Sequence, residues 1–203
     1  MTNTQATFSA KLLQDFLAIV RTEVGEKNLP VVLNKSSLPT DWASSESVKH
    51  LGAQAAAETY AGLQQAIRAY YGRGARGILQ RIGSKFWEDL LENASFKEKT
   101  QAKLLRGLPE TRRRKVALDM LVRLLDVKPG EIKVHTLDLN LLLVDNISPT
   151  TYNQRDDEPI CHVTHGLIRE AVYWVTSTDA QIEEVSCQAM GNKSCEFKIL
   201  FGE

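Results

Sequence analysis

Three cysteines, Cys161, Cys187 and Cys195, are the residues of this 203-residue chain best suited to metal-binding or redox chemistry. An odd number of cysteines argues against a disulfide framework, and the cytoplasm that we expect for this chain keeps thiols reduced. Each cysteine can then be a buried apolar residue, a reactive thiol or a metal ligand. The choice depends on whether the fold brings the sulfur atoms together.

Two of the cysteines lie in a predicted β-hairpin at the end of the chain. Residues 182–201 contain two β-rich runs, EEVSCQ and SCEFKILF, that flank the turn sequence MGNK. With the turn centred on Gly191, Cys187 and Cys195 face each other, with Cβ atoms about 4.5–5.5 Å apart. Such a pair can be two reduced thiols, a redox couple, or half of a tetrahedral thiolate site to which Cys161 adds a third sulfur.

The spacing alone does not determine a fourth ligand for such a site. The candidates near the cysteines are Glu183, Glu184, His162 and His165. Strand alternation places Glu184 on the opposite face from Cys187 unless the backbone bulges between them.

Helices are predicted for most of the first 130 residues. Apolar residues recur at intervals of three and four, which predicts helices over residues 8–24, 48–70 and 78–91. Ser95 and Glu98 form a capping-box pattern that predicts a short helix, and Pro109 can begin another helix that ends before Pro129–Gly130. Two prolines and a polar cluster predict that residues 26–45 form a loop with at most one short strand.

After Gly130 the apolar pattern changes to the period of a β-strand. Ile132 and Val134 alternate with polar residues, and the leucines that follow alternate in the opposite parity, so we expect a bulge or turn near Thr136. A polar loop and a helix over residues 165–176 precede the hairpin. The sequence therefore predicts an α+β fold in which N-terminal helices pack on an antiparallel sheet with one crossing helix and a C-terminal hairpin.

Composition makes several classes of function improbable. The 25 basic and 25 acidic residues give a formal net charge of zero, which provides no long-range field for nucleic acid or anionic lipid. No stretch approaches the roughly 18 apolar residues of a membrane span, and the N-terminus lacks a basic leader. We expect a cytoplasmic protein without membrane or nucleic-acid partners.

Two motifs are better explained by structure than by chemistry. Residues 72–77, GRGARG, fit the GxGxxG pattern, but helices rather than strands are predicted on both sides and no acidic residue ends a second strand. We interpret the motif as a tight passage between helices. The basic run 112–115 is interpreted as a solvated helix face. No spacing indicates a catalytic triad or a carboxylate pair, so no catalytic residue is assigned.

The stretch ICHVTHGLIREAVYWV, followed by IEEVSCQAMGNKSCEFKI, resembles the 4-vinyl reductase-like domain, a hydrocarbon-binding family related in fold to vesicle-tethering transport-particle subunits. The family pattern is a cysteine before a helix, Glu-x-x-Cys, a glycine-containing turn, and a second cysteine followed by alternating apolar residues. Its four positions are Cys161, Glu184, Cys187 and Cys195 in this chain. The resemblance implies that they form a structural zinc site with no open coordination position.

The resemblance also carries expectations about domains and ligand. It implies a 4-vinyl reductase-like ligand-binding domain over residues 46–203, after a helix-and-loop extension over residues 1–45, and a homodimer that holds an apolar or aromatic molecule between helices and sheet. The residues expected to line that pocket, which ordinary core packing explains equally well, are Leu121, Leu125, Leu139, Leu141, Leu143, Ile168, Val172 and Trp174.

Three functions follow from these expectations. The first is a stand-alone, zinc-stabilised small-molecule-binding protein that acts as a sensor or carrier rather than as an enzyme. The second is an accessory factor or reductase-like protein of tetrapyrrole (bacteriochlorophyll) metabolism, although no site for a hydride-carrying cofactor is recognisable. The third is a scaffold subunit without a ligand.

Overall fold

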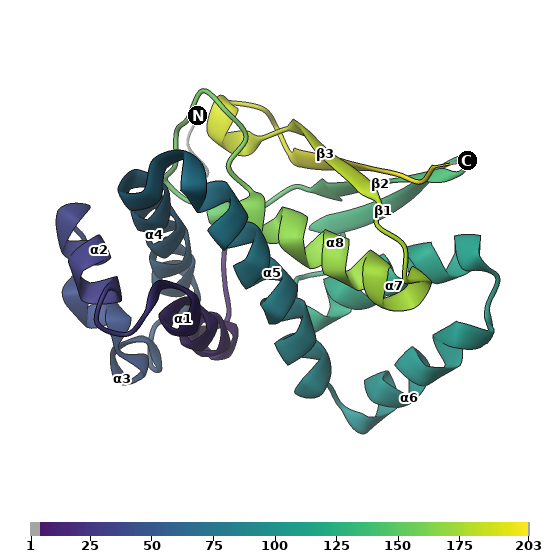
Figure 1. Cartoon of the computed structure of the whole chain (residues 1–203), viewed down its shortest axis with the longest axis horizontal. Helices are drawn as coiled ribbons and strands as arrows, with labels where there is room; N and C mark the ends of the chain where they lie inside the picture. The colour runs from purple at the N-terminus through teal and green to yellow at the C-terminus, as the bar shows by residue number, and fades with distance from the viewer. Residues whose placement is uncertain (1–4, 203) are drawn as a thin grey trace.

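The computed structural model describes residues 5–202 and has the predicted α+β architecture, with helices first and strands last (Figure 1). The helices are α1 (Ala10–Val24), α2 (Leu29–Lys35), α3 (Ser45–Val48), α4 (Ala53–Tyr71), α5 (Ala75–Glu92), α6 (Phe96–Leu104), α7 (Glu110–Leu124) and α8 (His162–Thr176). The strands are β1 (Ile132–Leu137), β2 (Asn140–Asp145), β3 (Gln181–Ser186) and β4 (Cys195–Leu200). Residues 1–4 and 203, the outer ends of the two predicted domains, lie outside the described residues.

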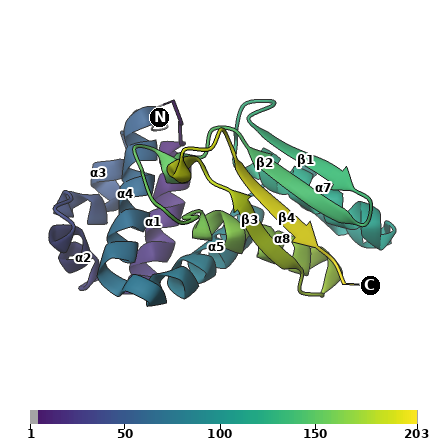
Figure 2. The same ribbon diagram turned by 90° about the horizontal axis from the view of Figure 1, so that it is seen from above.

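The four strands form one antiparallel sheet in the order β1-β2-β4-β3. Helices α7 and α8 cover one face of this sheet, and α1 to α4 gather beside it (Figures 1 and 2). The inward residues of the two central strands are buried and alternate with less buried residues. This alternation is expected for a sheet with one face packed on the core. Among the described residues, no helix has the length and apolar character needed to cross a bilayer.

A two-residue turn between β1 and β2 accounts for the predicted change of parity. Leu137 pairs with Asn140, so Asp138 and Leu139 form the turn. Asp138 has a φ of 53°, which an aspartate tolerates better than most residues. The turn leaves Leu139 60% exposed.

The first helix contributes to the same hydrophobic core as the rest of the chain. Its Phe16 ring lies 4.5 Å from that of Tyr60 on α4 and 5.8 Å from that of Phe86 on α5, measured between ring centroids. Gly25 ends the helix as predicted, with a φ of 91° that favours glycine. Helix α1 is thereby fixed against α4 and α5.

The prediction of a loop with at most one strand over residues 26–45 was wrong. This segment forms helix α2 and a 3-10 turn, Thr40–Ala43. Pro30 lies in the first turn of α2, where its missing N–H is not needed and its fixed φ suits a helix. Val32 and Leu33 are fully buried by this helix, so tertiary packing overrides the strand preference of the VVL run.

The predicted capping box is confirmed at the start of α6. The Ser95 N–H donates to Glu98 Oε2 at 2.9 Å, and the Glu98 N–H donates to Ser95 Oγ at 3.3 Å. Each side chain thus pairs with a backbone amide that the helix leaves free.

Helices α5 and α8 cross with their backbones in contact. Gly83 on α5 and Gly166 on α8 face each other, and a Cβ added to Gly166 would overlap the Gln80 carbonyl oxygen and lie 3.0 Å from the Gly83 Cα. Only glycine permits this approach. Helix α8 begins at His162, three residues earlier than predicted, with Cys161 as its N-cap. The glycine contact therefore fixes the position of Cys161.

Candidate metal centre

A β-bulge in the hairpin places Glu184 and Cys187 on the same side. Glu184 pairs with Phe197, whereas Ser186 pairs with Glu196, so Val185 is an extra residue in β3. The bulged Val185 is 41% exposed. An extra residue shifts the alternation of side chains by one. This is the condition under which the sequence allows Glu184 to join the cysteines.

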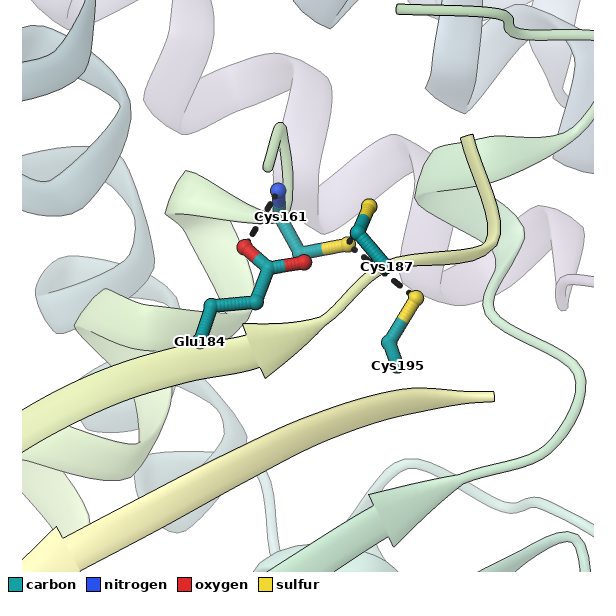
Figure 3. A group of neighbouring side chains, drawn as sticks. All are labelled: Cys161, Glu184, Cys187 and Cys195. Carbon is teal, nitrogen blue, oxygen red and sulfur yellow. Dashed lines mark hydrogen bonds between the residues drawn. The ribbon is translucent and has the colours of Figure 1, made fainter. Parts of the chain in front are cut away.

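The structure brings the three cysteines and Glu184 into one cluster (Figure 3). Cys161 Sγ lies 3.9 Å from Cys187 Sγ and 3.5 Å from Cys195 Sγ. One ligand atom from each of the four residues lies within 4.8 Å of all the others. A disulfide needs a sulfur–sulfur distance of about 2.05 Å, so these thiols are free. A tetrahedral ion with metal–sulfur bonds of about 2.3 Å separates its sulfur ligands by about 3.8 Å, which agrees with both distances.

The Glu184 carboxylate has one oxygen bonded and one oxygen open. Its Oε2 accepts the backbone N–H of Cys161 at 3.1 Å. Its Oε1 is buried and has no hydrogen-bond partner among the described residues. Buried carboxylate oxygens without a partner are costly. A cation between this oxygen and the sulfur atoms would satisfy it, so the residues fit a metal ion.

Burial opposes negative charge in this cluster. It raises the pKa of the Glu184 carboxyl from 4.5 to about 8, with a further contribution from Cys187, and it raises the pKa of the Cys161 thiol. The pKa of Cys187 is lowered instead, because the thiols of Cys161 and Cys195 stabilise its thiolate by hydrogen bonds. A bound cation would favour the charged form of all four groups.

Polar groups around the cluster stabilise the sulfur atoms. The backbone N–H of Gln188 donates to Cys195 Sγ at 3.4 Å. Ser148 Oγ lies 4.0 Å from Cys161 Sγ. Such surrounding partners orient metal ligands.

The two histidines considered as fourth ligands lie outside the cluster. His165 contacts the Ile182 carbonyl oxygen through Nε2 at 3.2 Å. Burial lowers the pKa of His162 to about 4, and the positive charges of Arg76 and Arg68 contribute. Glu184 therefore fits the fourth position better than either histidine.

A cavity of about 220 Å³ lies between the N-terminal helices, the end of α7 and the start of the sheet. Phe8, Tyr60, Leu125, Ile132 and Leu167 contribute apolar surface to it. Its polar lining includes the carboxyl group of Asp145, whose pKa burial raises to about 7.

Of the eight residues predicted to line a ligand pocket, only Leu125 borders this cavity. Trp174 is half-buried, with its ring centroid 6.0 Å from that of Trp87. Leu139 lies in the exposed turn between β1 and β2, and its position does not fit the predicted role. The remaining residues are buried in the hydrophobic core: Leu121, Leu141, Leu143, Ile168 and Val172.

Sequence reasoning overlooked the polar wall of the cavity, although one signal was present. Asp145 continues the inward alternation of Leu141 and Leu143 in β2, so a carboxyl group occupies a position that otherwise holds apolar residues. Charged residues are seldom fully buried without a specific reason. Tyr60 was interpreted only as part of the apolar stripe of its helix.

Comparison with solved structures identifies the fold. The structure of an Fe(II) unliganded H-NOX protein from K. algicida is similar with a TM-score of 0.57 and 13% identity, over 97% of each chain. An H-NOX protein from S. oneidensis in the Fe(II)NO ligation state gives 0.53 and 12%, over 94% of this chain and 99% of the other. The phenol-responsive sensory domain of the transcription activator PoxR, solved with phenol, gives 0.50 and 13%, over 70% and 73%.

The family comparison concerns the segment that holds the cysteines. No curated protein is detectably similar to the chain in sequence. The family model of the 4-vinyl reductase domain matches residues 147–201, which include Cys161, Glu184, Cys187 and Cys195. This match confirms the family resemblance recognised in the sequence. Residues 147–201 of the chain therefore belong to the 4-vinyl reductase domain family.

Proposed function

We propose that this chain is a zinc-stabilised domain that binds a small apolar or aromatic molecule. The observation that carries the proposal is the convergence of three sulfur atoms and one carboxylate oxygen within 4.8 Å. Thiolates with one carboxylate suit Zn²⁺ better than hard cations such as Ca²⁺ or Mg²⁺, which prefer oxygen ligands.

The zinc would serve a structural purpose. Cys161, Cys187, Cys195 and Glu184 would complete a four-coordinate shell without a position for a reactive water. The ion would connect the β3–β4 hairpin to the N-terminus of α8. Because the ligands are separate in the unfolded chain, much of the binding free energy would contribute to folding stability.

The cavity beside Asp145 is the proposed ligand site. Its aromatic and aliphatic lining suits an apolar ring, and the Tyr60 hydroxyl and the Asp145 carboxyl can hydrogen-bond a polar substituent. A volume of about 220 Å³ favours a single substituted ring over a tetrapyrrole. The proposal agrees with the phenol held by the PoxR sensory domain and with small-ligand binding by the H-NOX proteins.

Metal analysis combined with native mass spectrometry of the purified protein tests the proposal. We expect one zinc per chain and a co-purified or readily added small molecule. A bound pigment would favour the tetrapyrrole alternative, and zinc without any ligand would favour the scaffold alternative. The absence of zinc would overturn the metal site. The same spectra measure the oligomeric state, for which a homodimer stays a prediction.

The cavity is tested with phenol as a probe. Leu167→Trp should fill the space beside Tyr60 and weaken phenol binding at least tenfold, measured by isothermal titration calorimetry. Leu139→Trp makes the same change in the exposed turn and should leave binding unchanged. Equal phenol affinity in both variants would show that the cavity is not the site.

A further inference from the structure

A second, larger cavity opens on the other side of the metal centre. It has a volume of about 570 Å³ and lies between the α4–α5 connection, the loop before α8, and strand β3. Glu184 forms part of its wall. The GRGARG segment, residues 72–77, forms much of the opposite wall.

Three arginines line this cavity without an ion-pair partner. Arg68 lies near the end of α4, Arg73 in the short turn that follows, and Arg76 in the first turn of α5. None of them takes part in any ion pair found among residues 5–202. The chain thus concentrates three unpaired guanidinium groups on one wall of one cavity.

Arg68 is the most informative of the three. Its Nη2 donates to Gln154 Oε1 at 3.3 Å, but its Nη1 is buried and has no hydrogen-bond partner within the described part of the chain. Burial lowers the pKa of this guanidinium, and the charge of Asp156 offsets only part of the effect. A buried cation without a bonded counter-ion is costly, and a bound anion would remove that cost.

The backbone around the cavity adds to this preference. Helices α5 and α8 both begin at its wall, through Ala75 and His162. The N-terminus of a helix carries a partial positive charge and free N–H groups, which favour an anion.

Acidic residues restrict what else the ligand can carry. Asp156, Glu158 and Glu183 border the cavity on the loop and on β3. They would repel a second negative group placed away from the arginines. The cavity thus suits one anionic head attached to an uncharged or cationic body.

From this arrangement we infer that the cavity is a binding site for a small organic anion, held through one phosphate or carboxylate group by Arg68, Arg73 and Arg76. Arginine binds both groups with paired N–H donors. This site is separate from the cavity beside Asp145, so its occupancy does not depend on the ligand proposed there.

The test is an NMR titration of the metal-saturated protein with inorganic phosphate, with acetate, and with chloride at matched ionic strength. We expect saturable shifts of the Arg68 side-chain signal and of amides in residues 72–76 with at least one of the first two anions. Tighter binding of phosphate would indicate a phosphorylated ligand, and tighter binding of acetate a carboxylated one. If neither anion produces saturable shifts beyond those of chloride, the inference is wrong.

Variants locate the site. Arg73→Gln and Arg76→Gln change exposed side chains, and each should weaken anion binding about tenfold, the effect of losing one charge-assisted hydrogen bond. Arg112→Gln removes the same charge from an exposed position on α7 and should have no effect. Unchanged affinity in both cavity variants would also contradict the inference.

Discussion

At the scale of single residues, the proposed metal centre depends on groups that are unfavourable when uncharged partners surround them. Glu184 Oε1 is buried without a hydrogen-bond partner within residues 5–202, and burial raises the pKa of its carboxyl to about 8. Natural proteins retain such groups where a ligand compensates them. The four side chains therefore behave as a unit whose stability depends on a cation.

Replacement of a ligand tests that unit directly. Cys195→Ser and Glu184→Gln should each reduce the zinc content and lower the free energy of unfolding by several kcal/mol, because ligand loss removes binding energy that contributes to folding. Zinc content and urea unfolding measure the two effects. Glu183→Gln, one residue away and exposed, is the matched control and should behave like the parent. Parent-like unfolding of Cys195→Ser would contradict a structural metal.

Asp145 should make stability depend on pH. Burial raises its pKa from 3.8 to about 7, so the folded chain holds a proton that the unfolded chain releases near its ordinary pKa. The free energy of unfolding therefore falls as pH rises from about 4 to 7 and levels off above that range. Asp145→Asn cannot ionise and should gain stability over the parent, on the order of a few kcal/mol at pH 8 and almost none at pH 4.

Urea unfolding of the metal-saturated proteins across this pH range measures the difference. Asp157→Asn, at an exposed position in the loop before α8, serves as the control and should follow the parent curve. A constant difference between Asp145→Asn and the parent at every pH would show that this carboxyl does not titrate as described.

At the scale of elements, the crossing of α5 and α8 positions the site. Gly166→Ala should destabilise the fold by at least about 3 kcal/mol, because the added methyl group overlaps the Gln80 carbonyl oxygen and the two helices must separate. Gly74→Ala is the matched control, since nothing lies within 4 Å of its added Cβ. It should be neutral or slightly stabilising. Thermal unfolding of the two variants decides the matter, and similar melting temperatures would contradict the close crossing.

At the scale of the whole molecule, removal of the metal should loosen one part of the structure more than the rest. A chelator should lower the melting temperature and increase hydrogen exchange in β3, β4 and the start of α8, which the cluster connects. Helices α1 and α4 pack through Phe16 and Tyr60 and should keep their protection. A uniform loss of protection would show that the ion does not act locally.

The sequence was sufficient to predict the fold class and the four candidate ligands, because each depends on a strong local pattern. Alternation and the GNK turn indicate the hairpin, and the family pattern selects Glu184. The helix around Pro30 was missed because a proline and a VVL run both argue against a helix locally, whereas packing stabilises it. The cavities could not be predicted, since they arise where distant segments fail to fill space.

The bulge at Val185 bears on how readily an ion could leave the site. A hairpin without the extra residue would direct Glu184 away from the sulfur atoms and leave a three-thiolate shell with a vacant corner. Such a shell admits water or an incoming chelator and exchanges its ion quickly. The insertion of one residue in β3, more than the identity of any ligand, thus distinguishes permanent retention of the cation from rapid turnover.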